Sequence, residues 1–233
     1  MPLYLIPVTL GDTPHRQVLP GHNLDIILSI HHFIVENTRS ARRFLKKAHP
    51  PLVIDTLTFY ELNKHTPPES IAVFLAPLEQ GISVGLLSEA GCPAIADPGA
   101  GVVAEAQHRG YPVIPLVGPS SILLALIASG LNGQSFAFNG YLPVERQARI
   151  HSLRHLENLV SSLRQTQIFI ETPYRNDALA ADILRTCRPD TLLCIATSLT
   201  CPNESVRTLP IVEWRRVGLP PLDHLPTIFL LGV

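Results

Sequence analysis

The densest group of residues suited to ligand binding lies between residues 88 and 101, directly after an apolar segment at 82–87. Its sequence, Ser-Glu-Ala-Gly-Cys-Pro-Ala-Ile-Ala-Asp-Pro-Gly-Ala-Gly, combines small residues with prolines. Such residues let a ligand lie against backbone amides and carbonyls, and open α/β sheets bind ligands in loops beyond the carboxyl ends of their strands. The pattern favours a cofactor loop, the alternative being a proline-stiffened connection that binds nothing.

The segment 99–104, Gly-Ala-Gly-Val-Val-Ala, matches the letters of a dinucleotide-binding fingerprint but not its context. That fingerprint should follow a strand at once and be answered by an acid about 20 residues later. Here a loop separates it from the strand, and no Asp or Glu occurs between Glu105 and Glu145. The context argues against a nicotinamide enzyme. The absence of a Walker loop, a His-Glu-x-x-His helix and a Gly-x-Ser-x-Gly elbow argues against kinases, zinc proteases and hydrolases.

A second polar group, Glu36 to Arg39, stands at the carboxyl end of a predicted strand and at the start of a predicted helix. Asn37 or Thr38 can cap that helix. Glu36 and Arg39 remain available to orient a substrate or to help remove its proton. The alternative is an ordinary surface ion pair between these two side chains.

The helix that begins there carries a basic stripe about three turns long, with apolar residues on the opposite face. The stripe consists of Arg39, Arg42, Arg43, Lys46 and Lys47. In a chain with few other charges, this arrangement suits binding to a phosphate backbone. The alternative is a solvated helix face without a ligand.

Two further strand ends carry polar groups. Residues 118–121, Gly-Pro-Ser-Ser, precede a helix, where free amides and hydroxyls suit a small polar or anionic group, or one serine only caps the helix. In the segment 169–175, Tyr174 and Arg175 either stack on a base or only begin a helix. The ten histidines are scattered without ligand spacing, so no metal site is expected.

These groups need a scaffold, and the first half of the chain alternates between strands and helices. Strands are predicted at 3–8, 32–36, 52–56, 82–87 and 112–116, and helices at 24–30, 38–48, 67–78 and from 98 to Gly110. Continuous apolar strands separated by helices indicate a parallel sheet that is buried on both faces. A boundary after Val117 gives domains 1–117 and 118–233.

The second half predicts a mixed sheet. Strands are expected at 135–138, 167–170, 191–196, 204–209 and 227–231, with helices through Ala128, at 144–164 and at 176–186, and a proline-rich crossing at 219–226. The last strands follow one another with no predicted helix between them. The fold class is therefore α/β, with two α/β domains.

Composition excludes several classes of protein. Apolar residues form 46% of the 233 and charged residues only 16%, against a usual share of about 25%, which excludes a disordered chain. The net charge of −1 gives no overall attraction to nucleic acid or a membrane, so any RNA contact must be local. No apolar run approaches the ~20 residues of a membrane helix and no signal peptide is evident, which predicts a cytoplasmic protein. The cysteines, at 92, 187, 194 and 201, are expected to be reduced thiols.

Six ordered segments resemble motifs of the tetrapyrrole-methylase superfamily of S-adenosylmethionine-dependent methyltransferases. They lie at 3–11, 35–39, 87–99, 115–121, 139–143 and 171–175. The nearest branch is similar to the bacterial enzymes that methylate a cytidine ribose 2′-oxygen in small-subunit ribosomal RNA, with motifs of the types AEDTR, SDAGTPxISDPG, PGPSA, GFLP and ESPHR. The resemblance implies that backbone groups hold S-adenosylmethionine in a cleft between two domains, commonly in a homodimer.

The resemblance also implies roles for individual residues. Cofactor contacts are expected from Leu10, Gly91, Cys92, Pro93, Ile95, Ser120, Ser121, Ala196 and Thr227. Glu36 is the candidate base for a ribose hydroxyl, and Arg39 would position phosphate. Substrate contacts are expected from Asn37, Arg42, Arg43, Lys46, Tyr174 and Arg175.

The sequence departs from that branch at several positions. Asn37 stands where the ribosomal group has an acid, Glu89 and Cys92 replace its Asp and Thr, and residues 199–204 lack an expected lysine. The chain ends at Val233, about where the cofactor domain should close, which predicts a smaller RNA footprint. The leading hypothesis is a methyltransferase that acts on an RNA ribose. The alternatives are a methyltransferase for a small molecule or tetrapyrrole, and a non-catalytic protein that binds S-adenosylmethionine or RNA.

Overall fold

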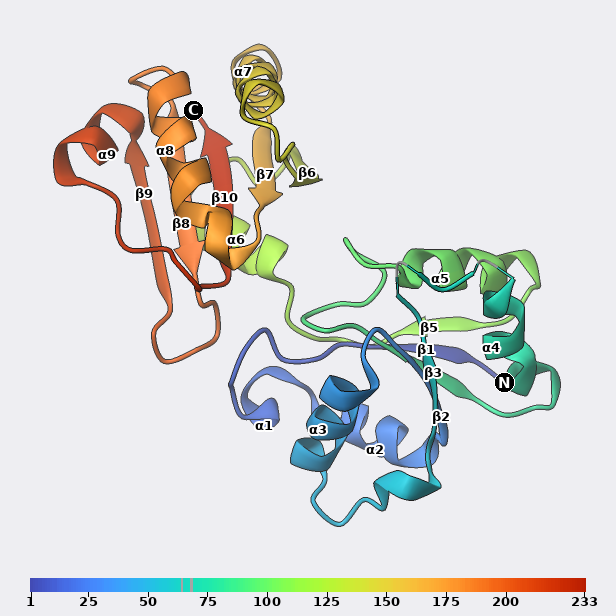
Figure 1. The fold of residues 1–233 in the computed structure, drawn as a ribbon. Helices are drawn as coiled ribbons and strands as arrows, with labels where there is room; N and C mark the ends of the chain where they lie inside the picture. The colour runs from blue at the N-terminus through green and yellow to red at the C-terminus, as the bar shows by residue number, and fades with distance from the viewer. Residues whose placement is uncertain (64, 68) are drawn as a thin grey trace. The chain divides into compact units, whose positions relative to one another are not determined.

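The chain divides into two compact units, Met1–Ser120 and Ser121–Val233 (Figure 1). The computed structural model describes residues 1–63, 65–67 and 69–233. Pro68, which belongs to the helix predicted at 67–78, therefore lies outside the described residues. Each unit has a five-stranded sheet and a hydrophobic core of its own.

The sheet of unit 1 (Met1–Ser120) is parallel throughout, as predicted, with the strand order β3-β2-β4-β1-β5. Its strands are β1 (Leu3–Ile6), β2 (His32–Val35), β3 (Thr58–Glu61), β4 (Val84–Leu87) and β5 (Val113–Pro115). Because parallel strands all end at the same edge, the segments that follow them become neighbours there.

Helices cover both faces of this sheet. They are α1 (His15–Val18), α2 (Gly21–Ser29), α3 (Thr38–Ala48), the 3₁₀ helix η1 (Ile54–Thr56), α4 (Ser70–Glu79) and α5 (Gly99–His108). On one face, α2 and α3 bury Ile27 and Leu45 against Phe33. On the other face, α4 and α5 bury Leu75 and Val102. Burial on two faces is what continuous apolar strands predict.

The strand predicted at 52–56 is wrong. This segment contains η1, and the edge strand β3 begins only at Thr58. Leu52 and Ile54 are apolar because they pack into the core from an irregular segment, not because they belong to the sheet. The ladder with β2 is formed by the β-branched and aromatic residues that follow.

The sheet of unit 2 (Ser121–Val233) is mixed, as predicted, with the order β6-β7-β10-β8-β9. Its strands are β6 (Phe136–Tyr141), β7 (Thr166–Ile170), β8 (Leu192–Thr197), β9 (Ser205–Pro210) and β10 (Thr227–Gly232). β6 and β7 are parallel, whereas β7, β10, β8 and β9 pair with antiparallel neighbours along the rest of the sheet.

The helices of unit 2 are α6 (Ser121–Ser129), α7 (Arg146–Leu163), the 3₁₀ helix η2 (Pro173–Arg175), α8 (Asn176–Thr186) and α9 (Ile211–Val217). The cluster that contains Leu153 of α7, Ile183 of α8 and Trp214 of α9 forms the core against the sheet. The prediction that no helix separates the last strands is wrong, because α9 lies between β9 and β10. This short helix starts after Pro210 and is fixed by Trp214, whose indole N–H donates to Leu193 O at 2.9 Å.

None of the helices in the described part of the chain combines the length and the apolar character that a membrane span requires. None of the cysteines at 92, 187, 194 and 201 forms a disulfide in the described structure, and Cys187 and Cys194 are buried.

Candidate functional site

In unit 1, the loop that follows β4 lies against the segments that follow β1 and β5. The amide of Val8 donates to Gly91 O at 3.0 Å, and Cys92 Sγ lies 3.5 Å from Pro119 O. Ser88 Oγ also donates to Gly91 O, at 3.0 Å. The order of the strands explains these contacts, since β1 lies between β4 and β5.

The loop has a conformation that restricts its residues. Gly91 has a φ of +70°, and a Cβ at this position would lie 3.0 Å from Leu10 Cδ2 and 3.3 Å from Pro119 O. Ala94 and Ala96 also have positive φ, which is uncommon outside glycine and often marks functional segments. The Asp97 carboxylate supports this geometry, because Oδ1 accepts from Ala94 N at 2.9 Å and from Gly99 N at 2.7 Å.

The other predicted cofactor residues fall into two groups. In unit 1, Pro93 is buried in the same loop, the side chain of Ile95 is 47% exposed, and Ser120 closes the segment after β5. In unit 2, Ser121 begins α6, while Ala196 and Thr227 lie on the neighbouring strands β8 and β10. Ala196 and Thr227 are both buried. The cofactor roles of all these residues stay predictions.

A hollow of about 670 Å³ opens beside the β4 loop in unit 1. Acids and amides dominate its lining, which consists of Glu36, Asn37, Asn63, Glu89, Ala96, Asp97 and Pro98. These residues follow β2, β3 and β4, three consecutive strands of the sheet, and this is why they converge. Over the described residues, no group of three or more His, Cys, Asp or Glu has an arrangement that could hold a metal ion.

Glu36 is half-buried at the wall of this hollow, and its Oε1 accepts a hydrogen bond from Glu89 N at 3.2 Å. Burial raises the pKa of Glu36, and the nearby Asp97 and Glu89 raise it further, although the hydrogen bond from Glu89 N acts in the opposite direction. Burial likewise raises the pKa of Asp97. Glu36 forms no ion pair with Arg39 in the described structure, so the surface ion pair considered above is wrong.

Of the two caps that the sequence allows, Asn37 and Thr38, the N-cap of α3 is Asn37. Its Oδ1 accepts from Arg39 N at 2.9 Å and from Ser40 N at 3.1 Å. Ser40 Oγ in turn donates to Glu89 Oε1 at 2.5 Å, which joins the first turn of α3 to the β4 loop. The cap and this bond therefore fix one wall of the hollow.

Glu61, Asn63 and Asp97 are polar residues of this edge that the sequence did not single out. Glu61 ends β3 and accepts from Thr38 Oγ1 at 3.1 Å, and Asn63 follows it. Glu61 and Asn63 were not predicted as site residues because β3 was predicted in the wrong place. Asp97 had a usable signal, since an Asp shortly before a helix commonly accepts hydrogen bonds from backbone amides at the helix start.

The basic stripe of α3 is exposed, and the opposite face of the helix is buried. Three of its five residues have partners within unit 1: Arg42 pairs with Asp55 at 2.6 Å, Lys47 pairs with Asp12 at 2.5 Å, and Lys46 Nζ donates to Leu52 O at 3.0 Å.

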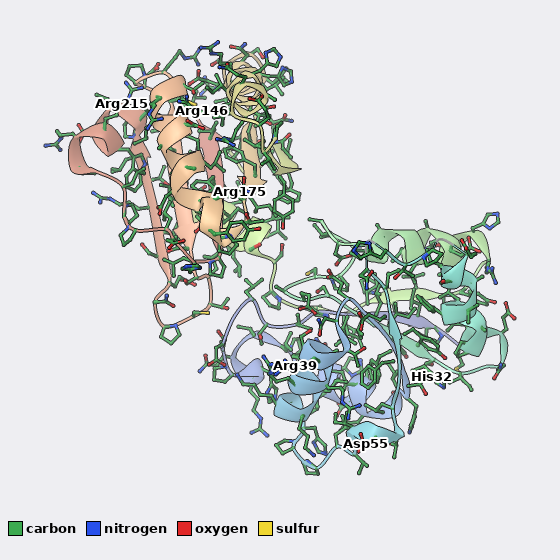
Figure 2. The ribbon with its side chains drawn as sticks, in the orientation of Figure 1. His32, Arg39, Asp55, Arg146, Arg175 and Arg215 are labelled. Carbon is green, nitrogen blue, oxygen red and sulfur yellow. The ribbon has the colours of Figure 1, made fainter. Side chains whose placement is uncertain are left out.

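Arg39 and Arg43 differ from the rest of the stripe, because their guanidinium groups make no hydrogen bond or ion pair with the described part of the chain. Figure 2 shows Arg39 on α3. Arg39 does not line the hollow that contains Glu36, so the two predicted catalytic residues have different surroundings.

Arg175, labelled in Figure 2, belongs to a fixed group at the end of β7 in unit 2. The Glu171 side chain is only 1% exposed, and its Oε1 accepts from Arg175 Nη2 at 2.6 Å and from Thr172 N at 2.7 Å. The Arg175 guanidinium lies 5.7 Å from the ring centre of Tyr174, whose residue is 68% exposed. Tyr174 thus presents an open aromatic ring next to a positioned cation.

Comparison with known proteins gives a relative that covers most of the chain. No protein-family model matches this chain. The ribosomal RNA small subunit methyltransferase I of Vibrio cholerae is 35% identical over 214 residues, which are 91% of this chain and 69% of that protein.

Solved structures share the fold. Diphthine synthase matches with a TM-score of 0.68 at 14% identity, over 100% of this chain and 90% of that one. The uroporphyrin-III C-methyltransferase of Thermus thermophilus, solved with S-adenosylhomocysteine, matches with a TM-score of 0.58 at 19% identity, over 100% and 97%.

The two five-stranded sheets give the chain the tetrapyrrole-methylase fold. The chain belongs to the ribosomal RNA small subunit methyltransferase I family. The expected superfamily, fold class and type of enzyme are therefore confirmed.

Proposed function

We propose that this chain transfers a methyl group from S-adenosylmethionine to a ribose 2′-oxygen in small-subunit ribosomal RNA. The observation that carries the proposal is the 35% identity to the Vibrio cholerae protein over 91% of the chain. A cytoplasmic location and a homodimer belong to the same proposal. Sedimentation velocity on the purified protein tests the dimer.

The β4 loop fits the cofactor. Most of its side chains are small, Ala96 is exposed, and Ile95 offers an exposed apolar surface. In unit 1, the residues that would hold the cofactor are Leu10, Gly91, Cys92, Pro93, Ile95 and Ser120. When bound, S-adenosylmethionine supplies an electrophilic methyl group on a sulfonium.

Glu36 is the proton acceptor in this proposal. Glu36 would accept the hydroxyl proton as the ribose oxygen takes the methyl group, and the electron pair of the broken carbon–sulfur bond would remain with the cofactor. The raised pKa of this carboxylate makes it a better base than an exposed glutamate. The rest of the rate enhancement comes from alignment, which contributes up to ~7–11 kcal/mol in favourable cases.

Asn37 changes what the hollow can recognise. Its Oδ1 is occupied by the helix cap, so the Nδ2 group is the part of the amide that remains to bind a substrate. An amide nitrogen donates hydrogen bonds, whereas the second oxygen of an acid at this position would accept them. Asn37 therefore suits an acceptor atom of the nucleotide.

The acids of the hollow also determine which part of the RNA each surface of unit 1 would bind. Glu36, Glu89 and Asp97 repel phosphate, so the reacting ribose can enter the hollow while its backbone phosphates stay outside. The unpaired Arg39 and Arg43 of α3 suit those phosphates, and Arg42 and Lys46 extend the same face. Tyr174 and Arg175 suit a base and a phosphate at a second point.

Methyl transfer to RNA tests the proposal. Purified protein is incubated with S-adenosylmethionine labelled in the methyl group and with small ribosomal subunits that lack this modification, and the RNA is then hydrolysed in alkali. A 2′-O-methyl group blocks cleavage of the next phosphodiester bond, so the label should appear in alkali-resistant dinucleotides. Label only in a small-molecule or tetrapyrrole acceptor, or cofactor binding without any transfer, would favour the alternatives instead.

A further inference from the structure

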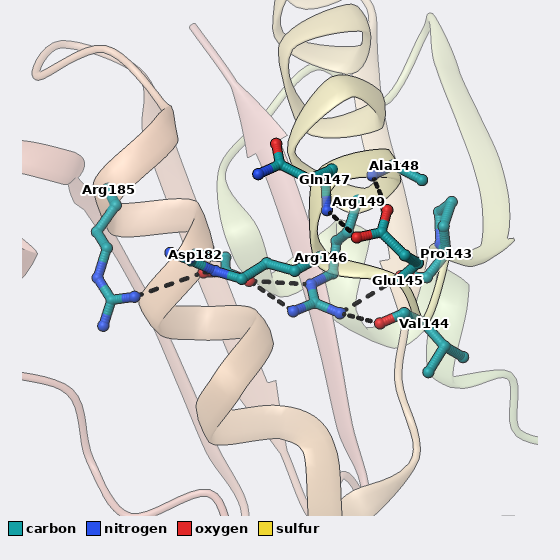
Figure 3. A network of polar contacts seen from close by, with 9 residues as sticks. All are labelled: Pro143, Val144, Glu145, Arg146, Gln147, Ala148, Arg149, Asp182 and Arg185. Carbon is teal, nitrogen blue, oxygen red and sulfur yellow. Dashed lines mark hydrogen bonds and ion pairs between the residues drawn. The ribbon is translucent and has the colours of Figure 1, made fainter.

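Three arginines converge on one buried carboxylate in unit 2 (Figure 3). Asp182 of α8 has a side chain only 3% exposed. Arg149 Nη2 lies 2.6 Å from Asp182 Oδ2, Arg146 Nε lies 3.1 Å from Oδ1, and Arg185 Nη1 lies 3.6 Å from Oδ1. None of these residues belongs to the site described above.

Arg149 is the buried member of this cluster. Its side chain is 9% exposed, its Nε and Nη2 both donate to Asp182 Oδ2, and its Nη1 donates to Val144 O at 2.8 Å. These bonds tie α7 to α8 and satisfy Asp182 Oδ2. Arg146 and Arg185 meet the other oxygen, Oδ1, and their side chains are 55% and 66% exposed.

The two exposed arginines leave the cluster with excess positive charge. Burial alone would raise the pKa of Asp182, but hydrogen bonds from Arg149 and Arg146 outweigh it and lower the pKa, so the carboxylate is ionised. Glu145 is the other acid of this group, and both of its oxygens accept from the first amides of α7. The three guanidinium groups therefore outnumber the two carboxylates, and the two that face solvent repel each other.

We propose that Arg146 and Arg185 form a further phosphate contact for RNA, on the α7–α8 surface of unit 2. This inference rests on the proposed RNA substrate. Asp182 holds the two guanidinium groups at a single oxygen, which reduces the side-chain entropy lost when they bind an anion. Arg146 uses Nε and Arg185 uses Nη1 for this purpose, so their remaining N–H groups are available for phosphate oxygens.

A double variant tests the contact. Arg146→Ala combined with Arg185→Ala removes both exposed cations and leaves the buried Arg149–Asp182 pair in place. The matched control is Arg207→Ala combined with Arg216→Ala, which removes two exposed arginines from β9 and α9 of the same unit. Both double variants lower the net charge by two, and thermal unfolding checks that each remains folded.

Binding of the intact protein to protein-free small-subunit ribosomal RNA is measured between 50 and 200 mM salt. With one phosphate per arginine, the Arg146/Arg185 variant should bind about tenfold more weakly at low salt, and its slope of log K against log salt should be shallower by about 1.4–1.8. The control should change neither value by a comparable amount. The affinity for S-adenosylmethionine should be the same in all three proteins.

Two results would overturn the inference and leave the proposed function standing. The first is methylation of RNA by the wild type while the Arg146/Arg185 variant binds RNA like the control. The second is a loss of binding to intact ribosomal subunits but not to protein-free RNA, which would assign the patch to a ribosomal protein. If the wild type neither binds nor methylates RNA, the proposed function fails first.

Discussion

At the scale of single residues, the chemistry of this chain depends on what surrounds Glu36. The same glutamate on an open helix face would have an ordinary pKa and little basic strength. Here burial and the neighbouring carboxylates oppose ionisation, and only the amide of Glu89 favours it. The hollow therefore makes the ionised carboxylate of Glu36 less stable, and for the same reason a stronger proton acceptor.

The substitution Glu36→Gln should lower the rate of methyl transfer by ~10²–10⁴-fold, because Gln keeps the shape of Glu but cannot accept the proton. Wild-type activity should fall as the pH drops through the raised pKa of Glu36, since only the ionised form is a base. Single-turnover rates at a series of pH values should show this acidic limb in the wild type and not in the variant.

Glu213→Gln is the matched control, because Glu213 pairs only with Arg216 at the surface of α9. Stability provides an independent check of sign. A carboxyl whose pKa is raised in the folded state binds its proton more tightly there, so stability decreases as the pH rises from the ordinary value through the raised one. Glu36→Gln should therefore be at least as stable as the wild type at neutral pH. A clear loss of stability would show that Glu36 is structural.

At the scale of elements, the β4 loop is a shaped segment and not a slack connection. Asp97 holds it from within, and the hydrogen bond from Val8 N to Gly91 O and the contact of Cys92 Sγ with Pro119 O hold it from the segments after β1 and β5. Gly81, which follows α4, has a similar φ of +75° but no atom within 4 Å of an added Cβ. The two glycines separate the effect of backbone conformation from that of close contact.

Gly81→Ala should cost about 1–2 kcal/mol in unfolding free energy, the usual penalty for a left-handed alanine. Gly91→Ala should cost about 1–3 kcal/mol more, because its Cβ meets Leu10 and the backbone of Pro119. It should also weaken S-adenosylmethionine binding at least tenfold, while Gly81→Ala leaves binding unchanged. Urea denaturation and calorimetric titration measure the two effects. Equal affinity in both variants would remove the β4 loop from the cofactor site.

The elements also show how far the sequence alone could predict this structure. The bounds of α3 and α8 agree with the prediction, since each has a strong amphipathic pattern and α3 has Asn37 as its cap. β3 and α9 were missed, because Leu52 and Ile54 are core residues without being in a strand and because α9 spans only seven residues.

The candidate site was predicted in parts but not as a whole. Glu36 and the β4 loop were visible as separate motifs. Their meeting with Asn63 depends on the order β3-β2-β4, which periodicity does not encode. The Arg149–Asp182 pair joins residues 33 positions apart on two helices, and no local pattern predicts it.

At the scale of the whole molecule, binding to RNA must work without help from net charge. The chain carries 18 basic and 19 acidic residues, so its overall charge of −1 slightly opposes a polyanion. Attraction must therefore come from places where cations outnumber their acidic partners or have none. On α3 these are Arg39 and Arg43, whereas Arg42 and Lys47 already pair with Asp55 and Asp12.

Two double variants of α3 separate contact from overall charge. Arg39→Ala with Arg43→Ala and Arg42→Ala with Lys47→Ala each remove two positive charges, so both change the net charge from −1 to −3. If only the long-range field mattered, both would weaken RNA binding equally. Arg39 and Arg43 have free donors for phosphate. The variant that lacks them should therefore bind RNA about tenfold more weakly at low salt, and its salt slope should be shallower by roughly 1.4–1.8. The Arg42/Lys47 variant should lose less affinity. Filter binding to small-subunit ribosomal RNA over a range of salt concentrations measures both.

Equal losses of affinity in the two variants would mean that α3 attracts RNA without touching it. A larger loss in the Arg42/Lys47 variant would mean that the ion pairs of these two residues open to bind phosphate.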